Sequence, residues 1–223
     1  MNIFALSRSP ILSAQQMIDK HIVKMPTETC QMLHTNHLFF AFVDFYGYEP
    51  SLKELKQYHK DFNSNLMKPA MLNHPSTIWA RKSMHNAKWL YEHGLALCKE
   101  FTYRYGKEHG SESRIKDMEN FYIESASWEK ATPVSIAMFD KYRIDRDVFY
   151  NTARVQFGIE TDEWDFVIES YRHYYLEGKW RFAGWRKNRR PEWYPENWYA
   201  VQFNKEVRSF NKRNGGNLKL MEE

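Results

Sequence analysis

Apolar residues recur at intervals of three and four along most of this chain, and strict alternation of apolar and polar residues is missing almost everywhere. The first such stripe runs through Ala14, Met17, Ile18, Ile22 and Met25. This spacing places one side of a helix against a core, whereas alternation would place one face of a strand there. The sequence therefore predicts an all-α protein of about seven to nine helices.

Small polar residues, prolines and glycines divide these stripes into separate helices. Ser13 and Gln16 have the spacing of a capping box, so we expect the first helix to begin near residue 14. Pro26 is expected to kink or restart that helix, because proline lacks the amide proton that a helix interior needs. Asn73-His74-Pro75 predicts another helix start, since proline is favoured in the first turn.

The length of the chain favours a single globular core. A chain of 223 residues with 43% hydrophobic residues can bury one sizeable core. We expect a helical domain over residues 1–190 and a C-terminal extension over residues 191–223, which ends in a loose tail after Gly215-Gly216. Within the domain, residues of about 48–70 have the polar character of an insertion, and Ser51–Phe62 is its expected helix.

Several classes of protein are disfavoured by what the sequence lacks. Cys30 and Cys98 form no CxxC pair and no disulfide framework, which favours a reducing cytoplasm. We find no signal peptide and no run long enough for a membrane span, so we expect a cytoplasmic protein without a membrane partner. The absence of a glycine-rich phosphate loop argues against a P-loop or Rossmann nucleotide site.

The positive charge of the chain gathers near its C-terminus. The net charge is +4, and residues 171–223 alone hold twelve Lys/Arg against six Asp/Glu. The densest stretch mixes basic residues with tryptophan and phenylalanine, a composition suited to phosphates and stacked bases. We predict that it holds a nucleic-acid backbone; the alternative is a solvated segment whose aromatics pack inward. Its basic residues are Lys179, Arg181, Arg186, Lys187, Arg189 and Arg190.

The strongest candidate for chemistry is a row of ionisable residues at helical spacing: His21, Lys24 and Glu28. Side chains three and four apart on a helix can shift one another's protonation, and histidine titrates near neutral pH. We therefore predict His21 and Glu28 as catalytic acid and base, and Lys24 as a group that stabilises developing negative charge. The alternative is a solvated Lys/Glu pair at a helix boundary.

Further clusters pair a cation with amide or aromatic groups, as a site for a phosphate and a base would require. Asn73 and His74 have an added advantage, because the first turn of a helix offers free N–H groups to an anion. The alternatives are structural: Asn73 caps a helix, and Arg104 with Lys107 balances a helix C-terminus. The predicted substrate- and phosphate-binding residues are Lys20, Asn73, His74, Arg81, Asn86, Arg104, Lys107, His109 and Arg172.

A metal site is disfavoured. His34 and His37 lie three residues apart on a predicted helix and could ligate together. No HExxH motif and no acidic partner at ligand spacing accompanies them. We therefore expect neither a metal nor a cofactor.

As a set, the motifs of this chain resemble a family of small proteins carried by tailed bacteriophages and some bacteria. The chain departs from that family at Pro26, at Phe139 and in the insertion over residues 51–67. The resemblance implies a phage-type setting, and hence a host cytoplasm, but no particular reaction. The motifs that carry it include Met1-Asn2-Ile3-Phe4, Asp19-Lys20-His21-Ile22-Val23-Lys24-Met25 with Glu28, Asn73-His74-Pro75, Trp79-Ala80-Arg81 and Tyr103-Arg104-Tyr105-Gly106-Lys107-Glu108-His109.

More loosely, the chain is similar to the helical, glycosylase-like transferases that phages use to modify thymine bases in DNA. This similarity implies a DNA-glycosylase-like fold by analogy. Our hypothesis is an enzyme directed at DNA or a nucleotide, which acts on a base or its attached group by group transfer or glycosyl-bond chemistry. The alternatives are a non-catalytic module that binds nucleic acid or a host protein, and a hydrolase of free nucleotides. The oligomeric state is open.

Overall fold

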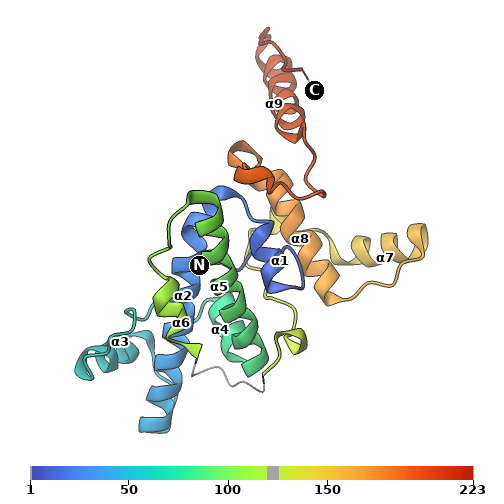
Figure 1. The fold of residues 1–223 in the computed structure, drawn as a ribbon. Helices are drawn as coiled ribbons and strands as arrows, with labels where there is room; N and C mark the ends of the chain where they lie inside the picture. The colour runs from blue at the N-terminus through green and yellow to red at the C-terminus, as the bar shows by residue number, and fades with distance from the viewer. Residues whose placement is uncertain (1, 120–125, 223) are drawn as a thin grey trace.

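The computed structural model describes residues 2–119 and 126–222, and these residues form α-helices and short 3-10 turns without a strand (Figure 1). The predicted all-α fold with a single globular domain is confirmed. Nine α-helices lie in the described ranges, which agrees with the expected seven to nine. They are α1 (Pro10–Gln15), α2 (Asp19–Tyr46), α3 (Leu52–Asp61), α4 (Pro75–Arg81), α5 (Met84–Tyr105), α6 (Glu112–Lys116), α7 (Arg146–Phe157), α8 (Glu163–Gly178) and α9 (Trp198–Asn214).

The main core lies between α2 and α5, with α1, α4 and α6 around them. Tyr171 and Tyr175 of α8 close this core from the C-terminal half of the chain, and both are fully buried. Residues 3–6 are also buried in it. The beginning of the chain is therefore part of the core and lies beside α2 and α8.

Helix α2 continues through Pro26 as one helix of 28 residues, so the expected restart does not occur. Pro26 is buried, and α5 approaches α2 very closely at the next turn. A Cβ on Gly94 of α5 would lie only 2.7 Å from Cγ2 of Thr29. The contact between two long helices offsets the missing hydrogen bond of one proline, which costs about 3 kcal/mol in a helix interior.

The predicted insertion forms a small second core at the far end of α2. Ser51 and Glu54 make the expected capping box of α3. Leu55 of α3 packs against Leu38 and Phe42 of α2. This cluster fixes α3 across α2 at one end of the molecule (Figure 1).

The C-terminal half is less deeply packed. Helix α7 has no buried residue and extends away from the other helices (Figure 1). The end of the chain lies along α9, because Asn204 exchanges two hydrogen bonds with the backbone of Met221. The expected tail is thus bonded to α9, and the domain boundary at residue 190 stays a prediction. No described helix is long and apolar enough to cross a membrane.

Candidate functional site

The carboxylate of Glu28 lies where α2 meets the beginning of the chain. Its Oε1 atom lies 2.8 Å from Nζ of Lys24, one turn earlier on α2. Its Oε2 atom accepts a hydrogen bond of 3.0 Å from the backbone N–H of Asn2. The side chain of Glu28 is 14% exposed and that of Lys24 is 70% exposed. Two of the predicted catalytic residues therefore meet with Glu28 mostly covered by protein and Lys24 exposed to solvent, and we call this partly covered position the recess around Glu28.

Asn2 is held in this place by residues from the C-terminal half. Its Nδ2 donates to the carbonyl of Ala137 at 2.7 Å, and its Oδ1 lies 2.9 Å from the hydroxyl of Tyr171. The same hydroxyl accepts from the Ala137 N–H at 3.2 Å and lies 3.0 Å from the Ser135 carbonyl. The sequence did not indicate Asn2 or Tyr171 as part of the site; for Asn2 the signal was its place in the Met1-Asn2-Ile3-Phe4 motif.

The ring of His21 lies in the core, more than one helical turn before Glu28 on α2. It stacks on Phe4 with ring centres 4.0 Å apart, and its Nδ1 atom lies 2.6 Å from the hydroxyl of Tyr175. Burial, together with the charges of Lys179 and Lys24, lowers the pKa of His21 to about 3. His21 is therefore neutral near pH 7 and is a weak base there, which does not fit the predicted acid–base role.

His74 lies in the electrostatic neighbourhood of Glu28. It is the N-cap of α4, and its Nδ1 accepts from the N–H of Ser76 at 3.2 Å, so His74 rather than Asn73 caps the helix. Burial lowers the pKa of His74, and the Glu28 carboxylate opposes that shift. The structure thus brings His74 toward the same recess, on the loop that leads into α4.

Arg104 is enclosed by protein acceptors. Its Nε lies 2.8 Å from Glu100 and its Nη1 lies 2.9 Å from Asp19. The carbonyls of Met17 and Gln15 accept from Nη1 and Nη2. The side chain has no exposed surface. Arg104 therefore joins α1, α2 and α5, and we leave it out of the proposed phosphate site.

Three more of the predicted binding residues have their polar groups bonded to the protein. The Asn86 side chain is buried and joins Trp79 to Thr132. Arg81 donates to the Leu72 carbonyl at 2.6 Å. Arg172 pairs with Glu169 on its own helix, and its guanidinium lies over a tryptophan ring. These residues hold neighbouring segments of the protein together.

The remaining predicted binding residues lie nearer the surface. Nε2 of His109 lies 3.2 Å from the carbonyl of Val23 on α2. Lys20 lies over the ring of Phe182 at 4.5 Å. Lys107 is exposed beside the C-terminus of α5. Lys20 and Lys107 are the cations of this set that stay accessible.

The basic segment over residues 179–190 is paired within the molecule to a large extent. Arg186 lies against Asp19 and over Tyr105, and Arg189 lies 3.2 Å from Glu100. Its tryptophans pack inward, as the alternative interpretation expected: Trp180 is buried and Trp185 donates to the Gln16 carbonyl. Contact of this segment with a nucleic-acid backbone stays a prediction. The other pairings are Arg181 with Glu206, Arg190 with Glu196, and Lys179 over Tyr174.

The two histidines considered for a metal have other contacts. Nδ1 of His34 accepts from the Met67 N–H at 2.8 Å, and Nε2 lies 3.3 Å from the Arg114 carbonyl. Burial lowers the pKa of His37. In the part of the chain that the structure describes, no three His, Cys, Asp or Glu side chains gather at a distance suited to a metal ion.

Residues 1–113 match the family model described as pyrimidine dimer DNA glycosylase. Neither a curated protein nor a solved structure matches the chain. The matched span contains Asn2, His21, Lys24, Glu28 and His74, and it ends before the residues that hold Asn2 from the C-terminal half. The expected similarity to glycosylase-like enzymes is supported, whereas the phage setting and the transferase chemistry stay predictions.

Proposed function

The chain belongs to the pyrimidine dimer DNA glycosylase family, and from that premise we propose that it breaks the glycosyl bond of a damaged or modified pyrimidine in DNA at the recess around Glu28. Action on a glycosyl bond in DNA follows from membership of the family. The substrate and the residues that act on it are proposed from the contacts of Glu28.

Breaking a glycosyl bond leaves positive charge on the sugar in the transition state. A carboxylate beside C1′ stabilises that charge, as it does in glycoside hydrolysis. Glu28 suits this role because it is recessed yet open to solvent, and because Lys24 and the Asn2 N–H fix both of its oxygens. This double fixation of a carboxylate is the observation that carries the proposal.

The departing base takes the bonding electrons and needs a cation or a proton. Lys24 is the exposed cation next to Glu28, and its ammonium group can approach the negative charge that develops on the base. His21 is neutral, so it supplies an uncharged wall of the recess. We therefore propose that Lys24 stabilises the leaving base. His21 holds the N-terminal residues in place through its stacking on Phe4.

The Asn2 nitrogen offers a second chemical route. In a chain from which Met1 has been removed, the atom now 3.0 Å from Glu28 is a primary amine. Its attack on C1′ forms a C–N bond and displaces the base; opening of the sugar ring then leaves an imine between protein and sugar. Borohydride reduces such an imine to a stable covalent link, so the two routes are separable.

A base-release assay tests the proposal. Duplex oligonucleotides that carry one pyrimidine dimer, or one modified thymine, are incubated with the protein, and the abasic sugar is measured by alkaline strand cleavage. This readout is needed because a base cut from a dimer stays joined to its neighbouring pyrimidine; from the modified thymine the free base is also measured by mass spectrometry. We expect Glu28→Gln to reduce release by about 100-fold or more, because the carboxylate acts in the transition state. The matched control is Glu112→Gln, which removes another carboxylate that is 12% exposed and paired with a lysine four residues away.

Each outcome of this assay has a defined meaning. Full activity of Glu28→Gln, or an intact glycosyl bond at every damaged or modified pyrimidine, contradicts the proposal. A gain of mass on the oligonucleotide, instead of an abasic site, indicates group transfer. A borohydride-trapped adduct whose linkage maps to the α-amine of Asn2 selects the amine route.

A further inference from the structure

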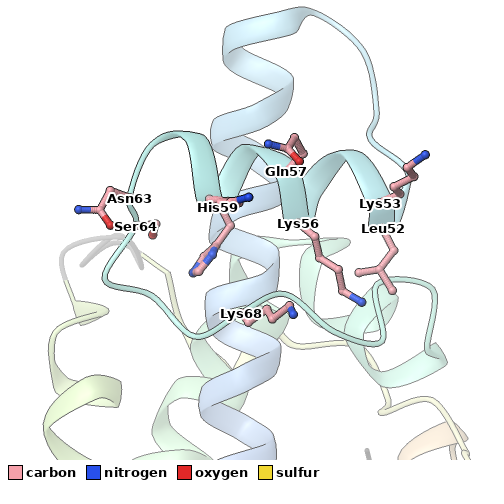
Figure 2. A pocket seen from close by; sticks show the side chains of 9 residues that line it. Leu52, Lys53, Lys56, Gln57, His59, Asn63, Ser64 and Lys68 are labelled. Atoms are coloured by element: carbon pink, nitrogen blue, oxygen red, sulfur yellow. The ribbon is translucent and has the colours of Figure 1, made fainter.

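A hollow of about 810 Å³ lies beside α3 and is lined by cations and amides, with no carboxylate among its lining residues. Three of its lysines, Lys53, Lys56 and Lys60, come from α3, and Lys68 comes from the loop that follows. Figure 2 shows Lys56 and Lys68 on facing sides of the space between the helix and the loop.

Helix α3 presents these lysines because its other face is occupied. Leu55 and Tyr58 pack toward Leu38 and Phe42 of α2, which fixes the rotation of the helix. Residues 53, 56 and 60 follow at spacings of three and four on the solvent side, as the helical period requires. All four lysines are exposed.

No ion pair joins the four lysines of this hollow to a carboxylate of the described residues, although they lie around one space. The arginines of the segment over residues 179–190 are, in contrast, paired with acidic side chains. Four unpaired ammonium groups around one hollow repel one another, and an anion that enters relieves that repulsion. The lysine ion pairs in the described residues are Lys24 with Glu28, Lys88 with Glu92 and Lys116 with Glu112.

The hollow is connected to the recess through α2 and the loop over residues 63–74. Gln31, three residues after Glu28, donates to the Lys68 carbonyl at 3.5 Å. Leu38, under α3, follows Glu28 by ten residues, which is about 15 Å along a helix. One strand of DNA advances about 3.4 Å per nucleotide, so this distance corresponds to four or five nucleotides, roughly.

We propose that the lysine hollow beside α3 holds the phosphate backbone of DNA about four or five nucleotides from the base bound at Glu28. The identification of the polyanion as DNA rests on the proposed function. The contact is independent of base sequence, because ammonium groups neutralise phosphates without reading base edges. The insertion that contains α3 would then bind DNA without taking part in the chemistry at Glu28.

Salt-dependent DNA binding tests the proposal. Fluorescence anisotropy with an undamaged duplex is measured over a series of salt concentrations. If all four lysines contact phosphates, their removal reduces the slope of log affinity against log salt by up to about 3.6, since each contact contributes about 0.9. We expect at least about a tenfold loss of affinity at low salt. The variant combines Lys53→Gln, Lys56→Gln, Lys60→Gln and Lys68→Gln.

A matched variant removes the same number of exposed lysines elsewhere, none of them in an ion pair of the described residues. It combines Lys99→Gln, Lys205→Gln, Lys212→Gln and Lys219→Gln. Both variants change the net charge equally, so the difference between them isolates the position of the charge. Equal affinities and equal slopes for the two variants overturn the proposal.

A second measurement separates this inference from the proposed function. The lysine variant should keep the base-release rate of the wild-type protein at saturating enzyme, because Glu28 and Lys24 are untouched. Its affinity defect should shrink on a hairpin duplex that ends about three base pairs from the damaged pyrimidine, short of the hollow. If the wild-type protein releases no base while the lysine variant still binds long DNA more weakly than its control, the proposed function fails and the lysine surface stands.

Discussion

Two charged clusters on α2 and its neighbours contain the same kinds of residue and have opposite surroundings. Lys24 and Glu28 form an ion pair one helical turn apart, and so do Glu100 and Arg104. The first pair is 70% and 14% exposed, whereas the second is 3% and 0% exposed. The first leaves room for a substrate, and the second has its hydrogen-bonding groups directed at protein. The two ion pairs therefore differ in solvent access and not in residue type, and only the exposed pair can contact a substrate.

The largest effect on stability should come from the enclosed cluster. We expect Arg104→Met to lower the free energy of unfolding by about 3 kcal/mol, because it leaves the buried Glu100 and the half-buried Asp19 without that cation. Urea unfolding followed by circular dichroism measures this loss. Arg154→Met on exposed α7 is the control and should change stability by less than about 0.5 kcal/mol. An unchanged urea midpoint for Arg104→Met would remove the contrast.

The next effect should fall on activity. Tyr171→Phe removes the hydroxyl that contacts Asn2 and the Ala137 N–H, so the backbone nitrogen beside Glu28 is less well fixed. We expect base release under single-turnover conditions to fall by up to about 100-fold while DNA affinity is kept, because misplacement of about 1 Å has such an effect. Tyr194→Phe is the matched control, since the Tyr194 hydroxyl is buried without a hydrogen-bond partner in the described residues. Equal loss in both variants contradicts a positioning role.

A buried histidine makes the stability of the protein depend on pH. His93 is enclosed against Trp89, and burial lowers its pKa to about 3. Below pH 6.5 the unfolded chain therefore binds a proton that the folded chain does not, so stability falls as the pH drops toward 3. In His93→Phe, the stability lost between pH 7 and pH 5 should be smaller by about 2 kcal/mol. Urea midpoints at the two pH values measure it; the same loss in both proteins would rule out His93 as a source.

The smallest effect on stability should come from the open pair. Lys24→Gln removes a solvated ion pair, so the free energy of unfolding should change by less than about 1 kcal/mol. Base release should nevertheless fall, because Lys24 faces the leaving base in the proposed mechanism. Lys116→Gln breaks a comparable pair on α6 and should leave release intact. A larger stability loss for Lys24→Gln than for Arg104→Met reverses the distinction between the two clusters.

Several helix starts could be predicted from the sequence because their signals are local. The start expected near residue 14 was wrong, since Ser9 caps α1 and α2 begins at Asp19. The capping box at Ser51 and the helix start at Pro75 are set by neighbouring residues, and both occur as expected. The restart expected at Pro26 did not occur, because the close contact between α2 and α5, which keeps α2 continuous, joins residues far apart in the chain. The row of Lys24 and Glu28 was also local, since one helical turn fixes it.

The rest of the site depends on contacts that no local pattern contains. Asn2 and Tyr171 are separated by 169 positions in the chain and meet only after folding. Arg104 looked as suitable for phosphate as Lys107, and the distinction comes from acceptors that folding brings to Arg104, among them Asp19 and the Gln15 carbonyl. The cations of α3 were similarly overlooked, because a polar helix in an insertion predicts solvent exposure and gives no indication of a shared hollow.

The burial of residues 3–6, with Asn2 fastened between α2 and α8, has a practical consequence for handling the protein. Any sequence fused ahead of Asn2 must pass out beside Glu28 and can obstruct that opening. An affinity tag at the other end would follow a segment that rests on the exposed side of α9, far along the chain from Glu28. Recombinant protein with a C-terminal tag is therefore the suitable material for every assay of base release.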